Sequence, residues 1–275
     1  MHFGRAADAL HIAQPVLSRQ IRAFEDELHV QLFVRDKRGT ALTPAGEQLR
    51  TDAPVLLTES EAVCRRVRRA AAGNRAFAVG FMPGLIVTGP ARALRSRHPD
   101  LRIEVVRTGW DDQVQALHDG RIDVSYLRLP VDQRGLTLRP LLREPRLVVF
   151  PSAHRLAGKE TVRIADLADE HLLQNPDAVP EWRDIATEAH APGAWPVHTV
   201  EEKLELVAAG QGIVVLPEST VTFYRRPDVR SAAIEDIGPN RVALAWVAAR
   251  LDPLIEEFAA LALAEHASTG QMSPE

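Results

Sequence analysis

The chain has 275 residues, of which 45% are hydrophobic and 25% are charged. This composition is ordinary for a globular protein, and the length suits two compact units. No apolar run approaches the roughly 20 residues needed to cross a membrane, and the first residues lack the basic-then-apolar pattern of a secretory signal. A single cysteine, Cys64, excludes an internal disulfide and a multi-cysteine zinc site. We therefore expect a cytoplasmic protein with no metal and no cofactor.

Charge is distributed unevenly along the chain, whose formal net charge is −4. Residues 1–75 carry 12 Lys and Arg against 9 Asp and Glu, whereas the remainder carries 21 against 28. A mildly basic head on an acidic body suits a protein whose head alone meets phosphate groups.

The first 28 residues predict two helices, over 3–10 and from Gln14 to Leu28. In the second helix, apolar residues recur in steps of four and three, at Leu17, Ile21, Phe24 and Leu28, which is one face of a helix. Pro15 suits its first turn. The opposite face carries Ser18, Arg19 and Arg22. Two helices joined by about three residues, the second basic outward, predict a helix-turn-helix.

A basic hairpin and a long helix follow. Two β-prone runs flank the segment Arg35-Asp36-Lys37-Arg38-Gly39, which predicts a cationic wing. Thr43 and Pro44 are a helix cap and a first helical residue, and the helix should run to about residue 72, with a kink at Pro54. Its apolar or small residues alternate in steps of four and three, at Leu49, Ala53, Leu56, Ser60, Val63, Val67 and Ala70. This spacing favours a dimerisation seam, and the alternative is a surface helix packed on its own protein.

From residue 75 the pattern alternates between strand and helix, which predicts an α/β fold with a parallel or mixed sheet. We expect strands at 76–81, 101–106, 122–127, 147–150, 172–174, 213–216 and 242–247. We expect helices after Pro83-Gly84 and at 111–119, 164–168, from about 181, 201–209 and 253–266.

Five linked motifs resemble those of the LysR-type transcriptional regulators almost position for position. They are FGRAA at 3–7, IAQPVLSRQI at 12–21, EDEL at 25–28, LF at 32–33 with Arg35, and LTPAG at 42–46. The resemblance continues through DGRID at 119–123 and LVAAGQGI at 206–213, and is nearest to the branch that regulates the degradation of aromatic compounds such as benzoate and catechol. It implies a winged helix-turn-helix over 1–44, a linker helix over 45–73 and a two-lobed effector-binding domain of periplasmic-binding-protein type over 75–267. Lobe I would comprise 75–150 and 240–267, and lobe II 151–239.

For DNA, the resemblance places the helix Gln14–Leu28 in the major groove of a double-stranded operator. The residues expected to meet bases and phosphates are Gln14, Pro15, Ser18, Arg19, Arg22, Arg35, Lys37, Arg38 and Thr43. A two-fold dimer, or a tetramer as is usual for relatives, implies a palindromic site, with RNA polymerase as a further partner.

For the effector, the resemblance implies a small-molecule site between the lobes, facing helix N-termini that attract carboxylates. The residues expected there are Gly84, Leu85, Thr108, Arg128, Glu181 and Trp182. Many relatives carry serine at the position of Gly84, so one hydroxyl contact is lost. Glu181 should repel an acidic effector unless it points away. For Thr108 and Arg128 a structural role is the alternative, and for Trp182 it is a core position.

Two departures from the family pattern stand out. Relatives have a further helix of roughly 15–20 residues before the segment matching His2-Phe3-Gly4, so we expect a truncated or mis-assigned start that leaves apolar helix faces uncovered. His29 replaces a glycine that usually caps the recognition helix in a left-handed conformation. No nucleophile elbow, phosphate-binding glycine loop or HExxH motif occurs, and the sequence therefore predicts no enzyme. The alternative to a regulator is a ligand-binding module without DNA binding.

Overall fold

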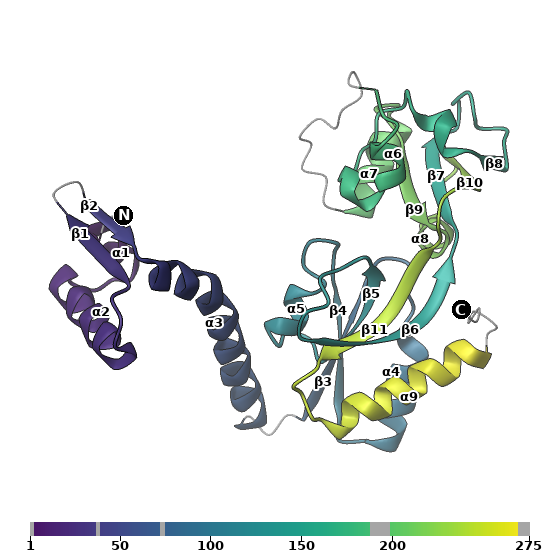
Figure 1. The fold of residues 1–275 in the computed structure, drawn as a ribbon. Helices are drawn as coiled ribbons and strands as arrows, with labels where there is room; N and C mark the ends of the chain where they lie inside the picture. Colours follow the sequence, from purple (N-terminus) through teal and green to yellow (C-terminus); the bar gives the residue numbers. More distant parts are fainter. Residues whose placement is uncertain (1–2, 37–38, 72–74, 188–198, 269–275) are drawn as a thin grey trace. The chain divides into compact units, whose positions relative to one another are not determined.

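The computed structural model describes residues 3–36, 39–71, 75–187 and 199–268 (Figure 1). The chain forms two compact units, residues 1–64 and residues 65–275.

The first unit contains α1 (Phe3–Ala9), α2 (Gln14–Leu28), β1 (Phe33–Asp36), β2 (Gly39–Leu42) and most of α3 (Pro44–Ala71). The strands pair antiparallel, with Phe33 opposite Leu42. The predicted bounds of α2 are confirmed, and the helix predicted from Pro44 is continuous through Pro54. Of the predicted apolar stripe, Leu17 is buried whereas Phe24 and Leu28 are exposed.

Three local contacts hold the hairpin to the helices of this unit. The Glu25 carboxylate accepts hydrogen bonds from the backbone N–H groups of Leu32 and Phe33, at 2.8 and 3.1 Å. The Phe3 and Phe33 rings meet edge to face, 5.3 Å between centroids. Gly46 packs so tightly that a Cβ there would lie 2.2 Å from the carbonyl oxygen of Leu32, so glycine is required at this position.

The second unit consists of two lobes, and the first is built on a five-stranded sheet in the order β4-β3-β5-β11-β6. Its strands are β3 (Ala76–Phe81), β4 (Arg102–Arg107), β5 (Val124–Leu129), β6 (Leu136–Glu144) and β11 (Asn240–Val247). β3 is parallel to β4 and β5, and β11 is antiparallel to β5 and β6. α4 (Thr88–Arg97) and α9 (Pro253–Ser268) lie side by side (Figure 1) and contribute Leu94 and Phe258 to a core that includes Phe77. The short α5 (Gln115–His118) contributes to a second cluster with Ala78 and Leu127.

The second lobe has a four-stranded sheet in the order β8-β10-β7-β9. Its strands are β7 (Arg146–Pro151), β8 (Thr161–Val162), β9 (Val214–Pro217) and β10 (Val229–Ile234). The helices are η1 (Ile164–Leu167), η2 (Pro176–Ala178), α6 (Pro180–Arg183), α7 (Val200–Ala208) and α8 (Glu218–Phe223). Because β7 pairs with strands of this sheet, it belongs to the second lobe, and the chain passes from the first lobe to the second at Pro145. From the sequence we expected this crossing after residue 150.

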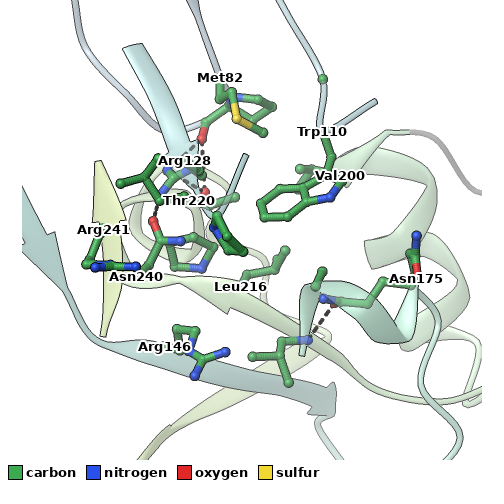
Figure 2. A pocket seen from close by; sticks show the side chains of 18 of the residues that line it. Met82, Trp110, Arg128, Arg146, Asn175, Val200, Leu216, Thr220, Asn240 and Arg241 are labelled. Atoms are coloured by element: carbon green, nitrogen blue, oxygen red, sulfur yellow. Dashed lines mark hydrogen bonds between the residues drawn. The ribbon is translucent and has the colours of Figure 1, made fainter. Parts of the chain in front are cut away.

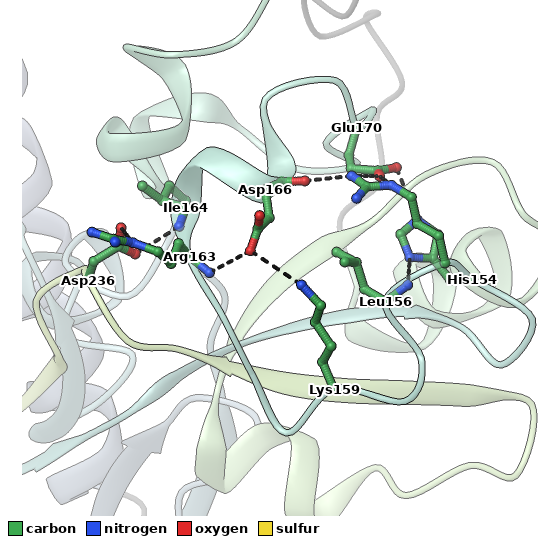
Figure 3. A network of polar contacts seen from close by, with 9 residues as sticks. His154, Leu156, Lys159, Arg163, Ile164, Asp166, Glu170 and Asp236 are labelled. Atoms are coloured by element: carbon green, nitrogen blue, oxygen red, sulfur yellow. Dashed lines mark hydrogen bonds and ion pairs between the residues drawn. The ribbon is translucent and has the colours of Figure 1, made fainter.

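A polar network fixes η1 to the surface of the second lobe (Figure 3). The Asp166 carboxylate accepts from the backbone N–H of Arg163 at 3.0 Å and lies 4.0 Å from the Lys159 ammonium. Asp236 accepts from the N–H of Ile164 at 2.8 Å, and Glu170 pairs with Arg155 at 2.8 Å. None of these residues lines the cavity between the lobes, so the network stabilises the lobe itself.

The α/β alternation predicted from residue 75 is confirmed, with several local differences. The helix expected after Pro83-Gly84 begins only at Thr88. The helix expected over 111–119 is reduced to α5, because residues 110–114 form turns in which the Asp112 side chain accepts from the N–H of Gly109 at 2.7 Å. The strand expected at 172–174 is a single bridge between Leu172 and Ile213.

Candidate functional site

The outer face of α2 is exposed in the way a DNA-reading helix requires. Gln14, Pro15, Arg19 and Arg22 are exposed and Ser18 is partly exposed. Across the described part of the chain, neither Arg19 nor Arg22 forms an ion pair. Both guanidinium groups are therefore available to phosphates or to base edges, which arginine can read bidentately.

The end of α2 is set by His29, which adopts the left-handed conformation at φ 55°. The N–H of Val30 bonds back to the carbonyl of Glu25 at 3.1 Å, as in a Schellman cap. His29 thus adopts the left-handed conformation that the family pattern assigns to a glycine at this position. An L-residue in this conformation costs free energy, which identifies His29 as a strained position.

The predicted wing residues are only partly visible. Arg35 lies in β1, but its side chain is not among the described ones, and Lys37 and Arg38 lie outside the described residues. Thr43 caps α3, as predicted: its hydroxyl accepts from the N–H of Gly46 at 3.0 Å and donates to the carbonyl of Gln31 at 2.6 Å. Its contact with DNA stays a prediction.

A cavity of about 760 Å³ lies between the two lobes of the second unit (Figure 2). The first lobe contributes residues at or just after the ends of β3, β4, β5 and β6, and residues at the beginning of β11. The second lobe contributes residues of β9 and of the start of α7. Apolar walls come from Met82, Trp110, Val200, Val215 and Leu216. The cationic residues of the lining are Arg107, Arg128, Arg143, Arg146, Lys203 and Arg241. Its acidic residues are Asp111, Asp112 and Glu181.

Arg128 bridges the lobes instead of offering a free charge. Its side chain is 3% exposed, and its guanidinium pairs with the buried carboxylate of Glu144. It also donates to Asn240 at 2.7 Å, to the carbonyl of Pro83 at 3.1 Å, and to the hydroxyl groups of Ser219 and Thr220 in α8. Arg128 lines the cavity, as predicted for an effector residue, but Glu144 neutralises its charge, and its contact with an effector stays a prediction beside the structural alternative.

Glu181 is also neutralised within the protein. It lines the cavity and pairs with Arg146, whose Nε donates to the carbonyl of Gly238 at 2.8 Å. Burial by itself would raise the pKa of Glu181, but the hydrogen bonds and charge of Arg146 outweigh it, and the pKa is lowered. The expected repulsion of an acidic effector is thus removed by Arg146.

Other lining charges are compensated to different degrees. Asp112 pairs with Arg121 at 3.2 Å, and Arg107 pairs with Glu201 at 3.5 Å. Arg143 and Arg241 face each other across β6 and β11. Among the described residues neither has an ion pair, and like charges directly opposite repel. The cavity therefore carries uncompensated positive charge.

Three predicted effector residues do not line the cavity. Trp182 is a core residue: it is fully buried in the second lobe, and its indole N–H donates to the carbonyl of Leu167 at 3.0 Å. Leu85 is buried in the core of the first lobe. Gly84 has φ +85°, and a Cβ on it would lie 2.6 Å from the backbone of Thr220. Gly84 thus allows the lobes to pack closely, whereas we expected only the loss of a hydroxyl contact.

Thr108 does line the cavity, and its hydroxyl lies 3.3 Å from the carbonyl of Phe81, to which it donates. Sequence reasoning missed Trp110 and Lys203. Trp110 follows the end of β4 closely, which is a position where ligand-binding residues gather in α/β folds. The start of α6 lines the cavity through Pro180 and Glu181, and so does the start of α7, through its cap Thr199 and first residue Val200. The capping box formed by Thr199 and Glu202 was a readable signal for that helix start.

The described residues contain no group of three or more His, Cys, Asp or Glu side chains that could hold a metal ion. Within the same residues, no helix is long and apolar enough to span a membrane.

A helix-turn-helix head joined to two lobes around a cavity defines a ligand-responsive DNA-binding regulator. A family model described as bacterial regulatory helix-turn-helix protein, lysR family, matches residues 1–47, and one described as LysR substrate binding domain matches residues 75–267. The chain belongs to the LysR family of transcriptional regulators, which confirms the resemblance seen in the sequence. The match over residues 1–47 favours this function over a ligand-binding module without DNA binding.

Similar proteins support the assignment. The Hca operon transcriptional activator HcaR of Escherichia coli (strain K12) is 30% identical over 273 residues, covering 95% of this chain and 92% of that protein. The HTH-type transcriptional regulator BenM of Acinetobacter baylyi is 35% identical over 231 residues, covering 79% and 76%.

Two solved structures of BenM share the fold. Full-length BenM has a TM-score of 0.59 at 28% identity, covering 99% of this chain and 94% of that one. The BenM effector binding domain with its effector benzoate has a TM-score of 0.58 at 24% identity, covering 72% and 95%. These relatives agree with the predicted resemblance to regulators of aromatic-compound degradation.

Proposed function

We propose that the protein binds a specific operator in double-stranded DNA and responds to a small acidic or aromatic effector in the cavity between its lobes. The cavity itself carries the proposal, because it combines the indole of Trp110 with the cations Arg143, Arg241 and Lys203, none of which has an ion pair among the described residues. BenM, a relative at 35% identity, is solved with its effector benzoate. An aromatic acid has both an apolar ring and an anionic group for such a lining.

On the DNA side, we propose that α2 enters the major groove. Gln14, Pro15, Ser18, Arg19 and Arg22 would meet bases and phosphates, with Arg35, Lys37, Arg38 and Thr43 on the flanking backbone. Arginine contacts to guanine edges give sequence preference, whereas phosphate contacts give affinity that falls with salt. RNA polymerase is a further proposed partner.

A dimer or tetramer is proposed through α3. Its residues Leu56, Val63 and Val67, all on the predicted seam, are 68%, 45% and 61% exposed. Apolar residues at this spacing favour pairing with a second helix. Two heads related by a two-fold axis predict a palindromic site with half-sites about one helical turn apart.

The test is a gel-shift titration on DNA from upstream of the protein's own gene, at several salt concentrations. The wild-type chain should prefer one fragment, and Arg19→Ala should reduce that preference by about 1–3 kcal/mol, or roughly 5- to 150-fold. Arg225→Ala, which changes an exposed arginine in the second unit, is the control and should leave binding unchanged. Weak, steeply salt-dependent binding to every fragment by the wild type would contradict the operator proposal.

The effector half of the proposal is tested with the same complex. A panel of aromatic acids and their neutral amides is added to the wild-type protein on its preferred fragment. At least one acid should change the mobility or the affinity of the complex, because an effector shifts a conformational equilibrium only by binding one arrangement more tightly. If no compound changes the complex, the cavity is not an effector site for this class.

A further inference from the structure

Lys203 is, with Arg143 and Arg241, a cation of the cavity wall that has no ion pair among the described residues. It lies one turn into α7 and lines the cavity. Arg128 and Arg146 have carboxylate partners, and so does Arg107. The Lys203 ammonium, by contrast, makes no hydrogen bond or ion pair with any residue that the structure describes.

The surroundings of Lys203 make a lone ammonium costly. Burial lowers the pKa of Lys203, and the more distant carboxylates of Asp111 and Glu202 oppose this only in part. Asp111 belongs to the first lobe and lines the same cavity, while Glu202 is committed to the cap of α7 through the N–H of Thr199. A partly buried charge without a partner favours binding of an opposite charge from outside the protein.

Part of the apolar lining of the cavity belongs to α7 itself. Val200 and Lys203 are three residues apart on this helix and therefore share a face, and Val200 lines the cavity. Figure 2 shows Trp110 at the Val200 end of the cavity and Arg241 at the other end. Arg241 thus lies away from Trp110 and Val200, whereas Lys203 comes from α7, the helix that carries Val200.

We propose that Lys203 is a specificity-determining residue of the effector site, whose ammonium binds a carboxylate carried by an apolar body lying against Trp110 and Leu216. The inference rests on the proposed effector function of the cavity. Gly84 offers no hydroxyl group and does not line the cavity. The charge of Arg128 is already neutralised. Lys203 has no ion pair among the described residues and stands on the helix that carries Val200 of the apolar wall, so we assign recognition of the anionic group to Lys203.

The experiment is calorimetric titration of the full chain with benzoate and with its neutral isostere, benzamide. The variants are Lys203→Gln, Lys203→Arg and the control Lys159→Gln, which changes a lysine of the Asp166 network outside the cavity. The wild type and Lys159→Gln should bind benzoate at millimolar or lower concentration and prefer it to benzamide. Lys203→Gln should weaken benzoate binding about tenfold or more, the effect of losing one charge-assisted hydrogen bond, and leave benzamide binding unchanged. Lys203→Arg should retain the preference for benzoate.

Three results would overturn the inference: no benzoate binding by the wild type, equal affinity for benzoate and benzamide, or wild-type affinity for benzoate in Lys203→Gln. Failure here is distinct from failure of the proposed function. A neutral compound that binds wild type and Lys203→Gln alike and shifts the DNA complex would leave the cavity as an effector site while removing the role of Lys203. If no compound shifts the DNA complex, the effector function itself fails.

Discussion

Replacing Arg128 by methionine tests the reasoning about the bridge between the lobes. The guanidinium donates to acceptors in both lobes and pairs with Glu144, which is itself only 7% exposed. The second oxygen of Glu144 accepts from the N–H of Ser219 at 2.7 Å, so the carboxylate cannot turn out to solvent without losing that bond. Arg128→Met therefore leaves a buried, uncompensated negative charge.

Breaking a buried ion pair from one side costs about 3–5 kcal/mol. For a unit of roughly 200 residues, each kcal/mol shifts Tm by about 2–4 °C, so Arg128→Met should lower Tm by about 6–20 °C. Urea unfolding followed by circular dichroism, together with thermal unfolding, measures both quantities. The control Arg134→Met removes an exposed pair with Asp132 and should have no measurable effect.

The double variant Arg128→Met/Glu144→Gln separates charge from packing. Glutamine keeps an acceptor for the N–H of Ser219 but removes the unpaired charge, so the double variant should recover at least about half of the loss. A loss below about 1 kcal/mol in Arg128→Met, or a double variant as unstable as the sum of the two single variants, would refute the assignment of a buried, mutually dependent pair.

Three further predictions follow from single positions. Gly84→Ala should lower the unfolding free energy by about 2 kcal/mol or more, because its Cβ would meet the backbone of Thr220 and alanine disfavours positive φ; a Tm equal to that of the wild type would contradict the close approach. His29→Gly should stabilise the first unit by about 0.5–1 kcal/mol by relieving the left-handed conformation, whereas Gln20→Gly in mid-helix should destabilise it by a similar amount. Lys203→Met should raise the Tm of the ligand-free protein at neutral pH, since the folded-state pKa of Lys203 is lowered. With this lowered pKa, the unfolded state binds more protons than the folded state, so the wild type gains stability as pH rises toward the ordinary lysine pKa of 10.5. The difference in Tm between the wild type and Lys203→Met should therefore disappear near that pH. A difference in Tm that does not change with pH would argue against a desolvated ammonium.

Local signals predicted the first unit well. The stripe from Leu17 to Leu28, the proline at position 15 and the Thr43 cap are short-range features, and each fixes a helix without help from distant residues. The exposure of Phe24 could not be read from the stripe, because periodicity says which residues share a face and not what covers that face.

The missed strands depend on tertiary pairing. β6 contains Pro140, which argues against a strand in sequence. In the sheet Pro140 lies opposite Ala243, next to a register shift in β11. β10 has the alanine-rich sequence VRSAAI, which has little intrinsic preference for strand, and it forms because β7 and β8 flank it.

Charge compensation in the cavity also depends on tertiary contacts that the sequence does not reveal. The sequence placed Arg128 and Glu181 near the cavity, but it could not show that their charges are neutralised by Glu144 and Arg146. These partners come from β6 and β7, on either side of the crossing between lobes. Lys203 was missed for the related reason that a cation in an amphipathic helix gives no sign of whether it faces solvent or a cavity.

The second lobe is inserted in the chain between two strands of the first lobe that pair with each other. β6 and β11 are hydrogen-bonded neighbours, yet the whole segment from Arg146 to Pro239 lies between them in the chain. During translation, the second lobe is therefore finished while β11, the strand between β5 and β6 in the sheet of the first lobe, is still being synthesised, and β5 and β6 each wait with an unpaired edge. We expect proteolysis of ribosome-held chains of increasing length to find the second lobe protected before the first, and earlier protection of the first lobe would contradict this order. While β5 and β6 lack β11, their open edges are available for edge-to-edge aggregation.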